Sequence, residues 1–306
     1  MLDKTKSRFT ESQLKRYIDC SQQSNFEIRA RCLSGAFIGA RSKSRIIEIT
    51  LALRRRARNY MGLDLEIDGL ITKSIRMELN PEINIIGLRL AEFSDEKLRE
   101  IKIYLPVSVE IDILSLSIDG DPLPKPRRKI LFLGDSITQG MECVSPVCIY
   151  PTVTAKILRA DFINQGVGGY FFDPLILDQN LPFNPEIITV SYGVNDWNMN
   201  FSAQTIKKAS SEYFEKLRRF YPDALIFAIT PIWTNKETEQ KSAGRIQDIR
   251  VIIEDVAISN GCTPINGLSL VPHDITYFAD DFHPNEKGHL IYGANLARLL
   301  LEKSII

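Results

Sequence analysis

Histidine and tryptophan are scarce in this chain of 306 residues, which has three of the former and two of the latter. The five cysteines are odd in number and irregularly spaced, which argues against a disulfide framework. Lysine and arginine together number 38, and so do aspartate and glutamate, so the formal net charge is zero. Because general nucleic-acid binders need a basic excess, this balance argues against a nucleic-acid partner.

Long apolar runs are also lacking, and no run is long enough to span a bilayer. The first ten residues lack the apolar core of a signal peptide, so the sequence predicts a cytoplasmic protein with no membrane partner. Cys143 and Cys148 lie close together in the sequence, and free thiols packed in a loop are the state we expect for them. The sequence leaves open whether copies of the chain form a homo-oligomer.

The first part of the chain has the pattern of short antiparallel strands. Apolar and polar residues alternate in several segments that turn residues separate, as in a sheet with one buried face. A short amphipathic helix over residues 11–20 is expected to precede them. The alternation therefore predicts a β-sandwich, of jelly-roll type, with strands within residues 26–32, 46–53, 63–69, 83–90 and 101–118.

The pattern changes at residues 121–129, where three prolines fall within six residues. Proline stiffens the chain and removes backbone donors, so this stretch predicts a linker between domains at 1–124 and 125–306. Strands and helices alternate after it, which predicts an α/β domain with a parallel sheet covered on both faces. The expected strands are 130–133, 161–164, 187–191, 224–229 and 263–266, and the expected helices are 202–220, 237–259 and 285–301.

The sequence Gly134-Asp135-Ser136 follows the first strand of this second domain. A serine at a strand's carboxyl end and at the start of a helix exposes its hydroxyl. It also lies beside backbone N–H groups that can bind a developing oxyanion. Ser136 is therefore a candidate nucleophile, and a serine that only caps a helix is the structural alternative.

Three more polar stretches fall where they can reach the same edge of the sheet, since sites form at the carboxyl ends of parallel strands. His283 lies three residues after Asp280, a spacing that lets the carboxylate orient the imidazole as a general base for a serine. The N–H of Ser136, a glycine N–H and the amide of Asn195 are candidate oxyanion donors. The stretches are residues 164–170, which are rich in glycine, 193–196 and 280–284.

Each of these stretches has a purely structural alternative. The glycines could form a strand-to-helix turn, 193–196 an Asx turn, and Asp280 with Asp281 a cap for the last helix. His289 falls inside that helix, where packing is its expected role. A metal site would need ligands from among His273, Asp274, Asp280, Asp281 and His283, whose spacing matches no marked metal motif, so we expect no metal and no cofactor.

Over about residues 129–303 the chain resembles the SGNH (GDSL-type) hydrolase superfamily. The resemblance rests on four motifs in this order: Gly-Asp-Ser-Ile, a glycine, Gly-x-Asn-Asp and Asp-x-x-His. The resemblance implies a flavodoxin-like sheet of about five parallel strands and a serine esterase without a cofactor. It assigns Ser136 as the nucleophile, with Asp280 and His283 completing a catalytic triad. It also assigns Asn195 and Gly169, rather than Gly168, as oxyanion donors beside the Ser136 N–H.

A sandwich ahead of such a domain resembles the two-domain carbohydrate esterases of family two. This second resemblance implies a small acylated substrate, an O-acetylated saccharide above others. Two alternatives remain at this point: a lipid or thioester acylhydrolase, and a catalytically silent carbohydrate-binding protein. Aromatic side chains next to the motifs are candidates either for the substrate pocket or for the core, namely Tyr170, Phe171, Phe172, Trp197 and Phe282.

Overall fold

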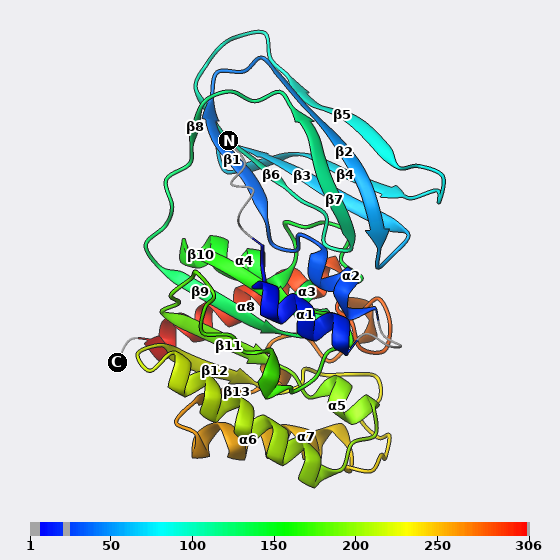
Figure 1. Ribbon diagram of the computed structural model, residues 1–306, viewed down its shortest axis with the longest axis vertical. Helices are drawn as coiled ribbons and strands as arrows, with labels where there is room; N and C mark the ends of the chain where they lie inside the picture. The colour runs from blue at the N-terminus through cyan, green and yellow to red at the C-terminus, as the bar shows by residue number, and fades with distance from the viewer. Residues whose placement is uncertain (1–6, 21–24, 305–306) are drawn as a thin grey trace.

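The computed structural model describes residues 7–20 and 25–304. Within them the chain forms two antiparallel sheets followed by one parallel sheet, so the predicted α/β fold with an antiparallel N-terminal domain is confirmed. In Figure 1 the antiparallel sheets occupy the top of the molecule and the parallel sheet with its helices the bottom. Two helices, α1 (Glu11–Asp19) and α2 (Phe26–Arg31), lie where the two parts meet.

The two antiparallel sheets enclose a common apolar core. Alternate residues of β2 and β3 contribute to this core, because successive side chains in a strand point to opposite faces, and the other face of β3 is buried as well. The strand pairs β1–β8, β2–β7 and β3–β6 are nested, and the sheet orders are β4-β3-β6-β1-β8 and β5-β2-β7. The strands are β1 (Phe37–Ser42), β2 (Ile46–Arg56), β3 (Tyr60–Ile67), β4 (Leu70–Glu78), β5 (Ile85–Glu92), β6 (Arg99–Tyr104), β7 (Val109–Leu116) and β8 (Asp121–Pro122).

The third sheet is parallel throughout and has the order β10-β9-β11-β12-β13. This is the flavodoxin-like order, in which the second strand lies on one side of the first strand and the remaining strands lie on its other side. The carboxyl ends of β9, β10 and β11 therefore surround the crevice where such sheets bind ligands. The strands are β9 (Lys129–Gly134), β10 (Asp161–Gly166), β11 (Ile187–Ser191), β12 (Leu225–Ile229) and β13 (Thr263–Ile265).

Helices cover both faces of the parallel sheet. Leu131 and Leu133 of β9 pack into one core with α1, α6 (Ala203–Phe220) and α7 (Ile246–Ser259). Ile130 and Phe132 pack on the opposite face with α4 (Tyr150–Leu158) and α8 (Glu286–Ser304). Short helical segments complete the described chain: α3 (Ser136–Gln139), α5 (Val194–Asn198), η1 (Pro174–Ile176), η2 (Gly267–Ser269) and η3 (Ile275–Tyr277).

The sandwich is bound to the parallel-sheet part through polar contacts close to the motifs. Asp64, buried in β3, accepts hydrogen bonds from the Ser145 hydroxyl (2.7 Å) and the Val147 N–H (3.1 Å). Arg76 of β4 forms an ion pair at 2.7 Å with Glu286, which begins α8 just after the Asp-x-x-His motif. These contacts place β3 and β4 of the sandwich beside the carboxyl edge of the parallel sheet.

One predicted strand is wrong. Residues 26–32 were expected to extend, and instead form α2. An alternating pattern of seven residues also places apolar groups four apart, and Phe26 and Ala30 bury the same helical face against the parallel-sheet core. An ion pair between Glu27 and Arg31, also four apart, fits the helix as well.

Residues 237–245 were expected to open a helix and do not, because α7 begins only at Ile246. The carboxylate of Glu237 binds Arg250 and the Thr234 N–H, which holds this stretch in a loop. Lys241 and Gly244 exchange backbone hydrogen bonds in a tight turn. The edge strand β4 was not predicted individually, since most of its residues are exposed and no buried face repeats along it.

Helices α1 and α2 precede the sandwich in the chain but pack into the core on one face of the parallel sheet, through Tyr17, Phe26 and Ala30, together with Phe9 just before α1. The boundary between residues 124 and 125 thus stays a prediction, and these two helices contribute to both parts. In the described ranges, no helix is both long and apolar enough to cross a membrane.

Candidate active site

Ser136 lies on the turn from β9 into α3, at the carboxyl edge of the parallel sheet. The cap of α3 is Asp135, whose Oδ1 accepts the N–H of Ile137 at 3.0 Å, so Ser136 does not serve as the cap. Burial raises the pKa of Asp135 to about 6. Because α3 has only four residues, its dipole adds less than the sequence suggested, and individual N–H groups matter more.

The structure brings together the three residues that the sequence predicted as a triad. His283 Nε2 lies 2.8 Å from Ser136 Oγ, and His283 Nδ1 lies 2.7 Å from Asp280 Oδ2. Asp280 Oδ1 accepts the N–H groups of Phe282 and His283. Burial alone would raise the pKa of Asp280, but the hydrogen bonds from His283 outweigh it and hold that pKa well below its usual value.

An ionised Asp280 accepts a hydrogen bond from the N–H at Nδ1 of His283, which leaves the lone pair of Nε2 facing the Ser136 hydroxyl. Ser136 is only 8% exposed, so its hydroxyl is largely shielded from bulk water. This arrangement can transfer the hydroxyl proton to the imidazole as the serine oxygen attacks an electrophile.

The loop that carries His283 is fastened from the β12–α7 connection. The Asp281 carbonyl accepts the Thr234 hydroxyl (2.7 Å) and the Asn235 N–H (3.0 Å). The Asp281 carboxylate binds the Asn235 amide (2.9 Å) and the Lys236 ammonium (3.0 Å). Asp281 therefore anchors the loop and does not cap α8, whose first N–H groups are bound by Asn285.

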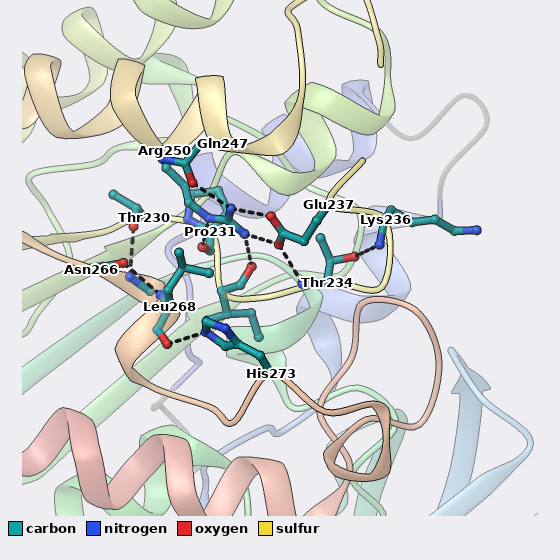
Figure 2. Close-up of polar contacts among 12 residues, drawn as sticks. Thr230, Pro231, Thr234, Lys236, Glu237, Gln247, Arg250, Asn266, Leu268 and His273 are labelled. Carbon is teal, nitrogen blue, oxygen red and sulfur yellow. Dashed lines mark hydrogen bonds and ion pairs between the residues drawn. The ribbon is translucent and has the colours of Figure 1, made fainter. Parts of the chain in front are cut away.

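That connection is in turn held by Arg250 of α7, as Figure 2 shows. The buried guanidinium donates to the carbonyls of Pro231 (2.8 Å) and Ile232 (2.9 Å) and to both carboxylate oxygens of Glu237. Sequence reasoning missed this cluster, because Glu237 and Arg250 are 13 residues apart and no motif links them.

Arg250→Met is expected to lower the free energy of unfolding by about 2–4 kcal/mol, because it leaves two carbonyls and a half-buried carboxylate without their donor. Urea unfolding followed by circular dichroism measures this loss. Arg298→Met is the matched control, since Arg298 pairs with Glu302 alone among the described residues, on the exposed side of α8, and its loss should change stability by less than about 1 kcal/mol. Equal losses in the two variants would contradict the anchoring role.

The glycine-rich loop after β10 offers a free donor at Gly169. The N–H of Gly168 is bound by Gln139 Oε1 at 2.8 Å, and the N–H of Tyr170 by the Val167 carbonyl at 3.1 Å. The N–H of Gly169 has no acceptor among the described residues. Gly169 has φ +78°, which suits glycine, and it is partly exposed. The contacts favour Gly169 over Gly168 as a donor to a ligand.

Asn195, on α5 just beyond β11, lies next to this loop. Its amide donates to the Tyr170 carbonyl at 2.9 Å and keeps a second hydrogen that no described residue accepts. The neighbouring Asp196 is buried and binds the Phe172 N–H at 3.1 Å, and burial raises its pKa to about 7. Asp196 thus fixes the loop after Gly169, while Asn195 is bound to the same loop and stays partly exposed.

The other histidines lie outside the Ser136 site. His289 is buried in α8, where its Nδ1 accepts the Tyr150 N–H and burial lowers its pKa to about 3. His273 is exposed and bonds to the Leu268 carbonyl (Figure 2). Within residues 7–20 and 25–304, no three His, Cys, Asp or Glu side chains gather as metal ligands.

Aromatic residues and cysteines beside the motifs divide between core and surface. Tyr170, Phe172 and Trp197 are buried in the core, while Phe171 and Phe282 are only partly buried. Cys143 and Cys148 are free thiols. Of these five aromatic residues, Phe171 and Phe282 keep exposed surface, although both also pack against the core.

Residues 132–291 match the model of the GDSL-like lipase/acylhydrolase family. The match covers more than half of the chain, and the chain belongs to this family. It is a carboxylic ester hydrolase by class, as the sequence predicted. A search among curated protein sequences returns no match.

Solved structures with the same two-part fold include enzymes of several specificities. A salicylyl-acyltransferase (SsfX3) from a tetracycline biosynthetic pathway is 15% identical with a TM-score of 0.78, over 98% of this chain and 90% of that one. A family two carbohydrate esterase from Clostridium thermocellum, in complex with cellohexaose, is 17% identical with a TM-score of 0.65, over 88% and 91%. An acetyl xylan esterase from Butyrivibrio proteoclasticus is 17% identical with a TM-score of 0.63, over 87% of each chain.

Proposed function

We propose that this protein is a serine esterase that hydrolyses short acyl esters, above all O-acetyl groups of a saccharide. The observation that carries the proposal is the hydrogen-bonded chain from Asp280 through His283 to Ser136, with contacts of 2.7 and 2.8 Å. Serine is a weak nucleophile at neutral pH and needs such a base, and the base needs an orienting acid. All three groups meet at the carboxyl edge of the parallel sheet.

In the proposed mechanism, Ser136 Oγ attacks the ester carbonyl while His283 Nε2 takes its proton. The tetrahedral intermediate collapses, and His283 returns that proton to the departing sugar oxygen, which leaves an acyl-serine. Water then attacks the acyl carbonyl as His283 removes its proton. Collapse of the second intermediate releases the acid and returns the proton to Ser136.

Three N–H groups would bind the oxyanion of both intermediates: those of Ser136 and Gly169 and one from the Asn195 amide. The free state of the Gly169 N–H and the anchored amide of Asn195 support this assignment. Donors of this kind, fixed before the reaction, commonly contribute about 2.7–4 kcal/mol each to the barrier.

The preference for a short acyl group is supported by crowding beside the oxyanion loop. A methyl group placed on Gly169 would lie 3.0 Å from Arg29 Nη1 and 3.4 Å from Phe26 Cε1, so that side of the loop is filled. The saccharide is supported by the names of two structural neighbours, a carbohydrate esterase and an acetyl xylan esterase.

The proposal includes a small acylated substrate, no cofactor, a cytoplasmic location and a catalytic domain at residues 125–306 behind an N-terminal domain at 1–124. The balanced charge of the chain supports the absence of a nucleic-acid partner.

Hydrolysis of p-nitrophenyl acetate against p-nitrophenyl octanoate, for wild type and Ser136→Ala, tests the proposal. We expect kcat/KM for acetate to exceed that for octanoate by about 10-fold or more, because a crowded site excludes the longer chain. The Ser136→Ala variant should retain only background turnover of either ester. Preference for octanoate would favour the lipid or thioester acylhydrolase, and no turnover by the wild type would favour the silent carbohydrate-binding protein.

A further inference from the structure

The peptide unit between Gly168 and Gly169 is held by a side chain from outside the parallel-sheet domain. Arg29, on α2 ahead of the sandwich, donates from Nη1 to the Gly168 carbonyl at 2.7 Å across 139 residues of sequence. Its guanidinium lies 3.0 Å from where a Cβ of Gly169 would be. Arg29 therefore rests directly on the loop whose N–H is the proposed oxyanion donor.

The direction of that N–H depends on the carbonyl that Arg29 binds. In a trans peptide the C=O and N–H of one unit point in opposite directions, so a contact that fixes the Gly168 carbonyl also fixes the Gly169 N–H. Glycine flanks the unit on both sides, and glycine tolerates backbone conformations on both sides of φ zero. Without an outside contact, this unit can therefore turn over at low cost and aim its carbonyl at the crevice.

The neighbouring hydrogen bonds do not hold this unit. The Gln139 side chain binds the unit before it, through the Gly168 N–H. The Val167 carbonyl binds the Tyr170 N–H, and Asn195 binds the Tyr170 carbonyl, both in later units. Among the described residues, Arg29 alone makes a hydrogen bond to the unit itself.

Hydrogen bonds to the backbone of Arg29 hold this residue in place beside the loop. The backbone carbonyl of Arg29 accepts hydrogen bonds from Arg8 Nη2 (3.0 Å) and Gln139 Nε2 (3.2 Å), so α2 is fastened independently of the Arg29 side chain. In the described part of the chain, Arg29 forms no ion pair with a carboxylate and its buried Nε has no acceptor. Its positive charge beside the loop is thus not neutralised by a neighbouring acid.

We propose that Arg29 is a positioning residue for the oxyanion hole, which orients the Gly168–Gly169 peptide and polarises its N–H toward the developing negative charge. A hydrogen bond from a cation to the carbonyl strengthens the donor at the other end of the same peptide. The segment that precedes the sandwich thereby completes the catalytic site. This inference rests on the proposed esterase function.

Kinetics of Arg29→Met, Arg29→Lys and Arg31→Met with p-nitrophenyl acetate test the inference. Arg29→Met should lower kcat by about 10- to 100-fold with KM changed less than about threefold, because the contact acts on the transition state. Arg29→Lys, which keeps a cationic donor, should recover part of that loss. Arg31→Met is the matched control two residues away, since Arg31 pairs with Glu27, and it should keep wild-type kcat.

A second measurement separates positioning from general damage to the fold. A boronic acid that forms a tetrahedral adduct with Ser136 should bind Arg29→Met more weakly, in proportion to the loss in kcat/KM. Thermal unfolding should show that all three variants fold.

Wild-type kcat in Arg29→Met, a loss confined to KM, no recovery in Arg29→Lys, or an equal loss in Arg31→Met would each overturn the inference. These outcomes are distinct from failure of the proposed function, in which wild type and Ser136→Ala hydrolyse the ester equally. If Arg29→Met fails to fold, the uncharged Arg29→Gln takes its place in both measurements, and wild-type kcat and boronic-acid affinity in Arg29→Gln would overturn the inference.

Discussion

Replacing His283 by alanine is expected to lower kcat for p-nitrophenyl acetate by about 10⁵- to 10⁶-fold, as in serine hydrolases that lose their general base. In this chain Nε2 of His283 is the group that contacts the Ser136 hydroxyl, at 2.8 Å. Without it, no described side chain is placed to take the serine proton, and the oxyanion donors alone remain. Steady-state kinetics at saturating ester measures the loss.

The control is His273→Ala, because His273 is exposed and bonds only to the Leu268 carbonyl among the described residues. Its kcat should stay within about twofold of wild type. The double variant Ser136→Ala/His283→Ala should be no slower than either single variant, since the two residues act as one unit. A His283→Ala loss below tenfold, or a further loss in the double variant, would contradict the shared role.

Asp280→Asn is expected to lower kcat by about 10⁴-fold with little change in KM. The carboxylate holds the proton on Nδ1 of His283, at 2.7 Å. An asparagine amide would donate to Nδ1 and move the imidazole proton to Nε2, so the nitrogen facing Ser136 could no longer accept. Circular dichroism should show an unchanged fold, because the size of the side chain is kept.

Asp281→Asn is the neighbouring control, with the carbonyl contacts to Thr234 and Asn235 retained and only the Lys236 ion pair lost. Its kcat should fall by less than about tenfold. Because the pKa of Asp280 is held well below its usual value, the acid limb of the wild-type pH–rate profile should not come from this carboxylate above about pH 4. Equal activity of Asp280→Asn and wild type would refute the orienting role.

The residues brought together at the site were predictable from sequence where their signal is local. Ser136 and Asn195 each follow a predicted parallel strand, and strand ends of one sheet meet at one edge. Asp280 and His283 are three residues apart, so their contact needs only a short loop. The parallel sheet was predictable from the alternation of strands and helices, whereas its flavodoxin-like arrangement was expected only from the family resemblance.

Residues whose partners are far away in the sequence were not predictable. Arg29 contacts Gly168 over 139 residues, and Gln139 contacts the same glycine over 29. Because only the folded chain brings the partners of each contact together, no spacing of residues in the sequence predicts either contact. The alternation over residues 26–32 also led to the wrong prediction of a strand there. As a result, the helix that places Arg29 against the oxyanion loop was not expected.

Ser136 carries the acyl group in the proposed mechanism, and reaction with a fluorophosphonate followed by peptide mass spectrometry tests this role. We expect one adduct per chain, on the peptide that contains Ser136, with ester hydrolysis lost in step with labelling. Ser136→Ala should remain unlabelled, and His283→Ala should be labelled far more slowly because its serine lacks a base. An adduct on another residue, or full hydrolysis by a protein that is not labelled at Ser136, would contradict the account.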